Sequence, residues 1–399
     1  MSQDFVAVLD LGTTKAVCLI ASMQGEKVKI HAVASTHSKA LRKGVLADYE
    51  EAAKALDVVI RRAEQDFGQE VGNLIVSISG GHIQSVSAQG LKMIVPRSRQ
   101  ITNQDVMEVI KHSRSIMLGS DREQIQAIPR FFTVDGNRDA NQPVGVSGGR
   151  LEVSTLIVSG DSEAISKLEK AVGMTGHKID QIIVAPLAAG IGVLKPSEMS
   201  NGAVVVDIGG SLTEIAIFQE GSLSAVASFP VGGEHVSNDI SQLLKTTFDE
   251  AERLKLAHGS ALASKAIDAE SVEVMQEGQE RARPMQRRVL CEIIESRMKE
   301  IAKMTSDTLI KNGVEALTGG IVLTGGGAQL ENTDQLFAEH FPTYKVRIAE
   351  PDLGAKIQKE PGMATAVGLA RYALQCQEEL MPATGPTSWR DRVKGLFSK

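Results

Sequence analysis

The chain contains one short motif twice. The first copy is VAVLDLGTTK over residues 6–15, and the second is VVVDIGGSLT over residues 204–213. Each copy has a short apolar run, an Asp, one apolar residue, a Gly, and then small or hydroxyl-bearing residues. The apolar run predicts a buried strand, and the glycine allows the following turn to approach a ligand with no Cβ between them. Two copies predict two lobes built on one plan, with a cleft between them.

The residue types in the two motifs predict a phosphate site. Free backbone N–H groups in such turns suit phosphate oxygens, and an Asp just before the turn is placed to hold Mg²⁺ through water. Two such hairpins facing each other would hold a nucleoside triphosphate from both sides. The candidate cofactor-binding residues of the two motifs are Asp10, Gly12, Thr13, Thr14, Lys15, Asp207, Gly209, Gly210 and Ser211, with Asp10 and Asp207 also the candidate magnesium ligands.

Two further segments contain small residues. The sequence IVLTGGGAQ over residues 321–329 predicts a strand that runs into Gly325, Gly326 and Gly327. This segment is either an ordinary turn before a helix or a backbone platform for an adenine ring. The sequence PGMATAVG over residues 361–368 would let a helix pack closely against its neighbour.

In this order and spacing, the four segments resemble the phosphate-1, phosphate-2, adenosine and second connecting motifs of the actin superfamily. The resemblance implies an α/β, two-lobed, actin-like fold that binds ATP with Mg²⁺. It adds Gly232 and Gly233 to the candidate cofactor-binding residues. Glu252 and Lys255, three residues apart, share one helix face. By position alone they are either a solvated pair or a ligand-binding pair, and the resemblance favours contacts with ribose and adenine.

Composition predicts a protein of two or three domains. The chain has 399 residues, and 43 basic against 49 acidic residues give a net charge of −6, so no general affinity for nucleic acid is expected. Cys18, Cys291 and Cys376 are scattered and predict free thiols in a reducing compartment. No signal peptide is expected. The longest apolar run, residues 182–194, contains a proline and is too short to span a bilayer.

The stretch from about residue 83 to 160 carries none of the nucleotide motifs. It contains a capped helix that begins at Thr102, and it is either a structural elaboration or a contact surface. This stretch, the sequence NQPVGVSG over residues 141–148, and the spacing of Glu252, Lys255 and His258 resemble the FtsA family of actin-like bacterial cell-division proteins. The resemblance covers essentially the whole chain and places the family's own subdomain, 1C, at this insert.

The expected domain organisation follows from these segments. Strands are expected near 6–9, 17–21, 28–33 and 74–78, and helices from about Asp48 and over about 162–173 and 288–311. The first of these helices has Leu56, Val59, Ile60 and Ala63 on one face, and the last has Leu290, Ile294, Met298 and Ile301 facing inward. The domains are a first lobe (1A) of residues 1–82, 161–195 and 350–375, an inserted subdomain (1C) of 83–160, a second lobe (2A/2B) of 196–349, a linker of 376–387 and an amphipathic helix of 388–399.

The last twelve residues predict a membrane-binding helix. Trp389, Val393, Leu396 and Phe397 form one helical stripe, and the opposite face is basic. The basic face contains Arg390, Arg392 and Lys394. Such a segment is too short to be a stable helix in water, but it could fold on an anionic bilayer. The alternatives are a frayed end or a helix docked on the protein itself. FtsA proteins carry a membrane-targeting helix at this place, which favours the membrane.

No catalytic residue is assigned. Hydrolases of the superfamily place a Gln or Glu in the first connecting motif to orient water, and the matching position here is Ala185. Glu214, which matches a later Asp of DnaK-type chaperones, is the candidate that could partly substitute. General-base help of about 10²–10⁴-fold is therefore expected to be absent. We expect ATP to bind with slow or negligible hydrolysis, and to act as a conformational ligand.

The resemblance implies an adaptor for cell division. Such a protein self-associates, lies peripherally on the cytoplasmic face of the inner membrane at the division site, tethers the FtsZ ring, and recruits later division proteins through the insert. It implies that the FtsZ C-terminal tail contacts the outer part of the second lobe. Arg297, expected to face outward, is either an anion partner for that peptide or a solvated residue. The alternatives are a PilM-like pilus-assembly adaptor, against which the basic tail argues, and a phosphotransferase of the sugar-kinase type.

Overall fold

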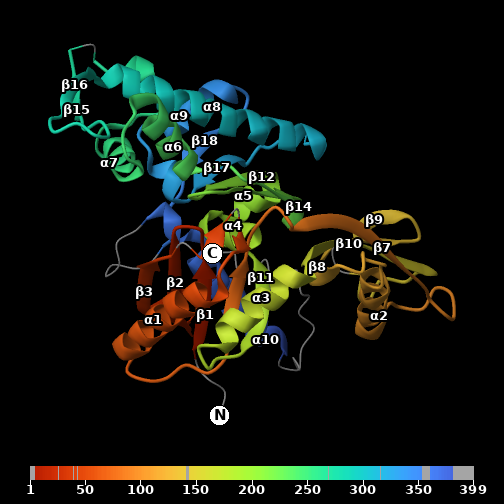
Figure 1. Ribbon diagram of the computed structural model, residues 1–399. Helices are drawn as coiled ribbons and strands as arrows, with labels where there is room; N and C mark the ends of the chain where they lie inside the picture. Colours follow the sequence, from red (N-terminus) through yellow and green to blue (C-terminus); the bar gives the residue numbers. More distant parts are fainter. Residues whose placement is uncertain are drawn as a thin grey trace.

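The computed structural model describes residues 5–380, apart from 26, 39, 43, 141–142, 268, 315 and 353–359. Figure 1 shows two lobes, each containing a sheet, and a separate subdomain that projects from the first lobe. The first lobe contains the N-terminal strands, and the second lies above it in this view. The predicted membrane helix, residues 388–399, lies outside the described residues.

The first lobe contains a five-stranded sheet in the order β11-β6-β1-β2-β3. Its strands are β1 (Val6–Leu11), β2 (Lys15–Gln24), β3 (Lys27–His37), β6 (Leu74–Ile78) and β11 (Ile179–Val184). Strands β1 and β2 form an antiparallel hairpin, and β1 pairs in parallel with β6. All four expected strands are present, and the three N-terminal ones are longer than expected.

The second lobe repeats this arrangement in the order β14-β13-β12-β17-β18. Its strands are β12 (Ala203–Ile208), β13 (Thr213–Gln219), β14 (Ser222–Phe229), β17 (Gly320–Thr324) and β18 (Val346–Ile348). Again the motif strand β12 forms an antiparallel hairpin with the next strand and pairs in parallel with a later one, β17. The prediction of two lobes on one plan is confirmed.

The helices of the lobes follow the predicted apolar stripes. Helix α1 (Tyr49–Phe67) begins after Asp48, whose carboxylate accepts hydrogen bonds from two backbone N–H groups of the first turn. Helix α3 (Ser162–Gly173) has the predicted bounds. Helix α8 (Arg287–Lys311) begins one residue earlier than expected and buries its predicted stripe, Leu290, Ile294, Met298 and Ile301.

The remaining elements belong to both lobes. They are β4 (Leu41–Arg42), β5 (Val45–Leu46), α5 (Pro196–Asn201), α6 (Gly233–Leu244), α7 (Phe248–His258), β15 (Ser271–Val274), β16 (Arg283–Gln286), α9 (Thr333–His340), and three short 3₁₀ helices, η1 (Ala263–Lys265), η2 (Gly326–Gln329) and η3 (Pro361–Met363). Cys18 and Cys291 are buried free thiols, as predicted.

The insert has a sheet and a hydrophobic core of its own. Its strands β7 (Gln84–Met93), β8 (Arg122–Val134), β9 (Asn137–Ala140) and β10 (Arg150–Asp161) form a sheet in the order β7-β10-β8-β9, and helix α2 (Asn103–Arg114) packs on it. Phe132 and Leu151 are fully buried in this core. Thr102 caps α2 as predicted, and Asp105 completes the capping box. The Arg99 guanidinium holds the pKa of the buried Asp105 carboxyl well below its usual range.

Helices α4 (Ala185–Val193) and α10 (Ala364–Leu380) pack together beneath the cleft. A Cβ on Gly368 would overlap the Ala188 carbonyl, and a Cβ on Gly192 would overlap the Ala364 carbonyl. The close helix packing predicted from the small residues is therefore confirmed. Helix α10 continues through residues 376–380, so the expected linker begins later than residue 376.

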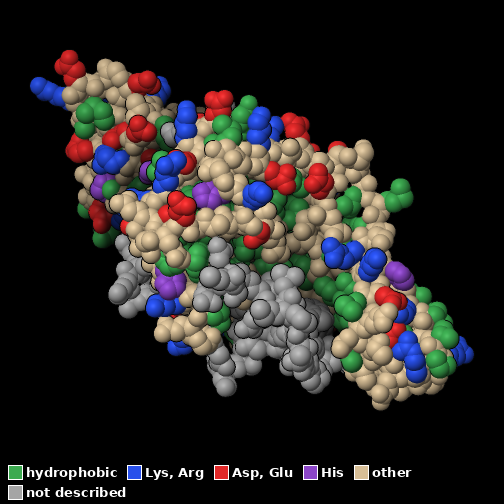
Figure 2. All heavy atoms as spheres, turned by 90° about the horizontal axis from the view of Figure 1, so that it is seen from below, with side chains coloured by type: hydrophobic (Ala, Val, Ile, Leu, Met, Phe, Trp, Pro, Cys, Tyr) green, Lys and Arg blue, Asp and Glu red, His purple; other side chains and the backbone are tan. Residues whose placement is uncertain are grey.

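The length and hydropathy of the helices, and the charges on one face, bear on the sequence predictions. Within the described residues, no helix is long and apolar enough to cross a membrane. On the face shown in Figure 2, the basic and acidic side chains of the described residues are interspersed.

Candidate functional site

The two motifs form equivalent turns. Gly12 N–H donates to Lys15 O at 2.9 Å, and Gly209 N–H donates to Leu212 O at 2.9 Å. An added Cβ on either glycine would lie 3.1 Å from the same acceptor oxygen. The repeated sequence therefore gives the same local backbone in both lobes.

The two turns contact each other across the cleft. The Ser211 N–H donates to Thr13 Oγ1 at 3.1 Å. A Cβ on Gly210 would overlap the Thr14 side chain, so only a bare backbone fits at this point. The apposition of the two predicted hairpins is therefore confirmed by direct contacts between the lobes.

A cavity of about 220 Å³ lies at these turns. It brings together most of the predicted phosphate and magnesium residues, and Ala185 and Glu214 also line it. Its predicted lining residues are Asp10, Gly12, Thr13, Thr14, Lys15, Asp207, Gly209, Gly210, Gly325 and Gly326. Ser79, Gly362 and Thr365 line it as well. The sequence analysis assigned the segment that contains Gly362 and Thr365 to helix packing alone, and Ser79 lies outside the four segments.

Three carboxyl groups are gathered at the base of this cavity. Asp10 accepts a hydrogen bond from Ser77 Oγ at 2.6 Å, and Glu214 is the cross-strand partner of Asp207. Burial raises the pKa of Asp10. Burial, and then the charge of Asp10, raise the pKa of Asp207 to about 7. Burial, and then the charge of Asp207, raise the pKa of Glu214 to about 8. Desolvation is the largest cause of each raised pKa, and the charge of a neighbouring carboxylate adds to it at Asp207 and Glu214.

These carboxyl groups fit a hydrated cation rather than a fully protein-ligated metal. Within the described residues, no group of three or more His, Cys, Asp or Glu side chains is arranged to hold a metal ion directly. Asp10 and Asp207 come from opposite lobes and line the same cavity. A magnesium ion that keeps several waters suits two such carboxylates.

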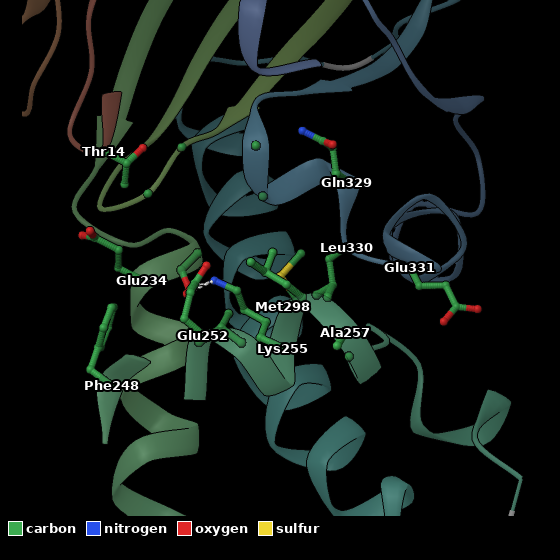
Figure 3. A pocket seen from close by; sticks show the side chains of 18 of the residues that line it. Thr14, Glu234, Phe248, Glu252, Lys255, Ala257, Met298, Gln329, Leu330 and Glu331 are labelled. Carbon is green, nitrogen blue, oxygen red and sulfur yellow. Dashed lines mark hydrogen bonds and ion pairs between the residues drawn. The ribbon is translucent and has the colours of Figure 1, made fainter. Parts of the chain in front are cut away.

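A second cavity, of about 680 Å³, adjoins the first and shares Thr14, Gly209, Gly210 and Gly326 with it. This volume lies within the range of ordinary small-molecule sites. It is enclosed by helices α6, α7 and α8 and by the glycine-rich segment after β17 (Figure 3). The predicted residues Gly233, Glu252, Lys255 and Gly327 line it.

Glu252 and Lys255 form a partly buried pair in this cavity (Figure 3). The Lys255 ammonium donates to Glu252 Oε2 at 2.7 Å, to Ser237 Oγ at 2.9 Å and to Gly233 O at 3.0 Å. Only 11% of the Lys255 side chain is exposed, so the alternative of a solvated pair is wrong. All three ammonium hydrogens have acceptors within the protein. Lys255 therefore holds Glu252 in place.

Apolar side chains complete the larger cavity. Phe248, Met298 and Leu330 line it (Figure 3). The sequence analysis placed Met298 on the inward stripe of its helix but assigned no site role to any of the three. Nothing local distinguishes an apolar residue that lines a cavity from one that fills a core.

Two predicted residues do not line either cavity. A Cβ on Gly232 would lie 2.5 Å from Gly209 O and 2.6 Å from Gly210 O. Gly232 therefore allows the start of α6 to pack beneath the second turn. Ser211 contributes its backbone N–H to the contact between the turns. Both residues support the site without facing its interior.

Arg297 differs from the expectation that it faces outward. Its Nε and Nη2 donate to the two Asp239 oxygens at 2.7 and 2.9 Å, and Nη1 pairs with Glu300. Only 23% of the Arg297 side chain is exposed. Helix α6 packs against α8 and brings Asp239 to the arginine, and a bidentate pair of this kind is strong. Arg297 therefore already has an anion partner within the chain.

The two-lobed architecture defines an actin-like protein. MreB5 of Spiroplasma citri bound to ADP superposes with a TM-score of 0.59 at 15% identity, covering 96% of this chain and 100% of that one. A chain of the PilM–PilN type IV pilus biogenesis complex superposes with a TM-score of 0.65 at 14% identity, covering 92% and 98%. At these identities the similarity establishes the fold.

Sequence similarity then identifies the family. The family model described as cell division protein FtsA matches residues 204–368, and the model for the SHS2 domain inserted in FtsA matches residues 80–159. Cell division protein FtsA of Pseudomonas aeruginosa is 31% identical over 95% of this chain and 92% of its own length. FtsA of Escherichia coli K12 is 32% identical, with 99% and 97% covered. The chain belongs to the FtsA family of cell division proteins.

Proposed function

We propose that this chain is an ATP- and Mg²⁺-binding adaptor that self-associates and tethers the FtsZ ring to the inner membrane. Nucleotide binding is supported chiefly by the contact between the two equivalent glycine turns. Ser211 N–H donates to Thr13 Oγ1 where the two cavities join. The larger cavity has room for a nucleoside. The smaller one offers backbone N–H groups to phosphates.

In the larger cavity, Gly326 and Gly327 form the platform for the base, and Phe248 and Met298 supply apolar contacts. Glu252 accepts hydrogen bonds from the ribose hydroxyls. Lys255 acts through Glu252, since its donors are used within the protein. This division of roles follows from which groups retain unused hydrogen-bonding capacity.

In the smaller cavity, the turns at Gly12 and Gly209 contact the phosphates. Asp10 and Asp207 hold Mg²⁺ through its waters. The raised pKa values of Asp10 and Asp207 support this role, because a divalent cation supplies the positive charge that the cluster lacks. Bound magnesium would neutralise phosphate charge in this space.

We expect ATP hydrolysis to be slow. Ala185 cannot orient a water, and burial raises the pKa of Glu214, the other candidate, to about 8, which disfavours the ionised form that a general base requires. Steady-state phosphate release from purified protein with Mg²⁺ and FtsZ measures this. A turnover of about one per second or faster, abolished by Asp207→Ala, would reveal a base elsewhere in the site.

The adaptor role follows from membership of the FtsA family. We propose that the tail, residues 388–399, binds anionic lipid on the cytoplasmic face of the membrane at the division site. The outer part of the second lobe, near α8, would bind the FtsZ C-terminal tail. Because Arg297 is paired with Asp239, an acidic peptide would contact it only by replacing that carboxylate. The insert would contact later division proteins.

Co-pelleting with liposomes tests the adaptor function. FtsZ should pellet with anionic liposomes only when this protein is present, and ATP should increase the amount through self-association. FtsZ without its C-terminal tail is the matched control and should stay in the supernatant. Pelleting of this protein without recruitment of FtsZ would contradict the tethering role. Binding to a pilus-protein peptide instead would favour the PilM-like alternative, and substrate-dependent ATP turnover would favour a phosphotransferase.

A further inference from the structure

The lysine of the first motif is already engaged by a carboxylate. Lys15 Nζ lies 2.6 Å from Glu360 Oε1, and the two side chains are 31% and 38% exposed. Glu360 immediately precedes η3, far from the motif in sequence. Lys15 lines the smaller cavity, so this ion pair lies at the edge of the space that the phosphates would occupy.

The residues that follow Glu360 contact the end of β17 and the glycine-rich segment. Thr324 Oγ1, at the end of β17, donates to Pro361 O at 3.0 Å. A Cβ on Gly362 would lie 3.0 Å from Lys15 Nζ and 3.6 Å from Gly326 N. The bare backbone at Gly362 therefore makes room for the ammonium next to the glycine-rich segment.

An anion in the smaller cavity would depend on Lys15 for a positively charged partner. Among the described residues that line it, Lys15 is the only Lys or Arg, whereas Asp10, Asp207 and Glu214 are acidic. A triphosphate chain would bring several further negative charges. The donor that Lys15 directs at Glu360 Oε1 serves one acceptor, so a phosphate oxygen placed at that position would replace the carboxylate.

We propose that Glu360 is an internal competitor for Lys15, which a polyphosphate must displace when it enters the smaller cavity. This proposal rests on the proposed nucleotide site and specifies how that site discriminates between ligands. A nucleoside in the larger cavity leaves the Lys15–Glu360 pair intact. A triphosphate chain, which extends furthest into the smaller cavity, breaks it. Glu360 therefore makes affinity depend on the number of phosphates.

Isothermal titration calorimetry at fixed free Mg²⁺ tests this with adenosine, ADP and ATP. Glu360→Gln should tighten ATP binding by about threefold, the size expected for release of a partly exposed ion pair. ADP should gain less and adenosine should gain nothing. Lys15→Gln should weaken ATP binding, because it removes the group for which the two anions compete.

Two variants separate competition from a general charge effect. Glu350→Gln removes the same charge from an exposed site just after β18 and should leave ATP affinity unchanged. In a Lys15→Gln background, Glu360→Gln should no longer tighten ATP binding, since the contested group is gone. Thermal unfolding of each variant verifies that the fold is retained.

Four results would overturn the proposal. Weaker ATP binding by Glu360→Gln would show that Glu360 positions the Lys15 ammonium to contact phosphate. If Glu360→Gln raised the affinity for adenosine as much as for ATP, the effect would be simple electrostatics. The same conclusion would follow if the gain in ATP affinity persisted in the Lys15→Gln background. If the unaltered protein binds no ATP, the proposed function fails first. Inorganic tripolyphosphate, which needs no nucleoside cavity, then tests the competition directly, and no effect of Glu360→Gln on its binding would refute it.

Discussion

The three consecutive glycines after β17 have three different surroundings. Gly325 has a φ of +86°, and a Cβ there would overlap Asp207. A Cβ on Gly327 would lie 3.0 Å from Ile208 O. A Cβ on Gly326 would meet nothing within 4 Å, and Gly326 lines both cavities. Of the three, Gly326 alone could accept a side chain without disturbing the protein, and that side chain would enter the ligand space.

Gly326→Val should therefore weaken ATP binding by about tenfold or more while leaving the fold intact, because the added side chain occupies the proposed base platform. Calorimetry measures the affinity, and thermal unfolding tests the fold. Gly173→Val is the matched control, since Gly173 also has open space around it but lies at the end of α3. Undiminished ATP affinity in Gly326→Val would contradict the placement of the base.

The carboxyl groups of the cleft make stability depend on pH. Glu214 ionises near 4.5 as a free group and near 8 in the folded protein. Between these values the folded protein holds a proton that the unfolded chain has released. The free energy of unfolding therefore falls as pH rises from about 4.5 to about 8. Asp207, with a pKa raised to about 7, acts in the same direction.

Glu214→Gln removes the ionisable group at this position. In the nucleotide-free protein, we expect the variant to gain stability relative to the unaltered protein by about 1–3 kcal/mol between pH 5 and pH 8. Urea unfolding at several pH values measures the difference. Glu350→Gln, at an exposed position, serves as the control. Parallel pH profiles for Glu214→Gln and the unaltered protein would show that Glu214 is ionised in the fold.

At the scale of elements, the contact between α4 and α10 depends on two glycines that face each other's helix. Gly368 meets the Ala188 carbonyl and the backbone of Gly192, where no Cβ fits. The Arg371 guanidinium also donates to the Ile191 and Gly192 carbonyls at the end of α4. This arrangement joins the closing helix of the first lobe to the helix that leads into the second.

Gly368→Ala should destabilise the protein by about 1–3 kcal/mol, since the methyl group forces the two helices apart. Urea unfolding measures the loss. In contrast, Gly173→Ala at the exposed end of α3 should be neutral or slightly stabilising, because alanine favours the helix. A stability for Gly368→Ala equal to that of the unaltered protein would mean that α4 and α10 can separate without cost.

A set of hydrogen bonds around His82 links the first lobe to the insert. His82 Nδ1 accepts from the Asp161 N–H at 3.2 Å, and its Nε2 lies 3.1 Å from Ser79 O. Arg122 donates to the His82 carbonyl at 2.9 Å. Burial lowers the pKa of His82, so the ring is neutral and links both segments at neutral pH. Ser79 also lines the smaller cavity, so the base of the insert lies next to the proposed phosphate site.

At the scale of the whole molecule, the folded body and the tail have separate roles in the proposed function. On the face shown in Figure 2, the described part of the body carries interspersed basic and acidic side chains. The tail combines an apolar stripe with a basic face. One short tail binds a bilayer weakly, whereas an array of tails on a polymer binds far more tightly. Membrane attachment would therefore depend on self-association.

Trp389→Glu or removal of residues 388–399 should release the protein from anionic liposomes without changing ATP binding, because the charge enters the apolar stripe of the tail. Ser398→Glu, on the opposite side of the predicted helix, is the matched control and should retain most binding. Trp389 is the only tryptophan, so its fluorescence should shift to the blue on mixing with vesicles. Unchanged pelleting after truncation, with no shift, would place membrane attachment elsewhere.

Local patterns in the sequence determined the elements and the repeated plan. The spacing in residues 6–15 and 204–213 was sufficient to predict two equivalent turns, and Thr102 and the apolar stripe of α8 predicted a cap and a buried face. These features depend on residues within a few positions of one another, whose backbone geometry is set by short-range sterics and hydrogen bonds. The repeat itself also predicted a cleft between two lobes, and the resemblance to actin-like proteins supported it.

Only the tertiary structure decided which charged side chains are already paired with other groups of the protein. Arg297 was expected to face outward, but its partner Asp239 lies 58 residues away in the chain. Lys15 meets Glu360 across 345 residues, and Lys255 has all its donors satisfied by α6 and α7. The sequence determines which residues carry charge, but the availability of each charge for a ligand depends on how distant segments pack, since a buried or paired group must first leave its partner.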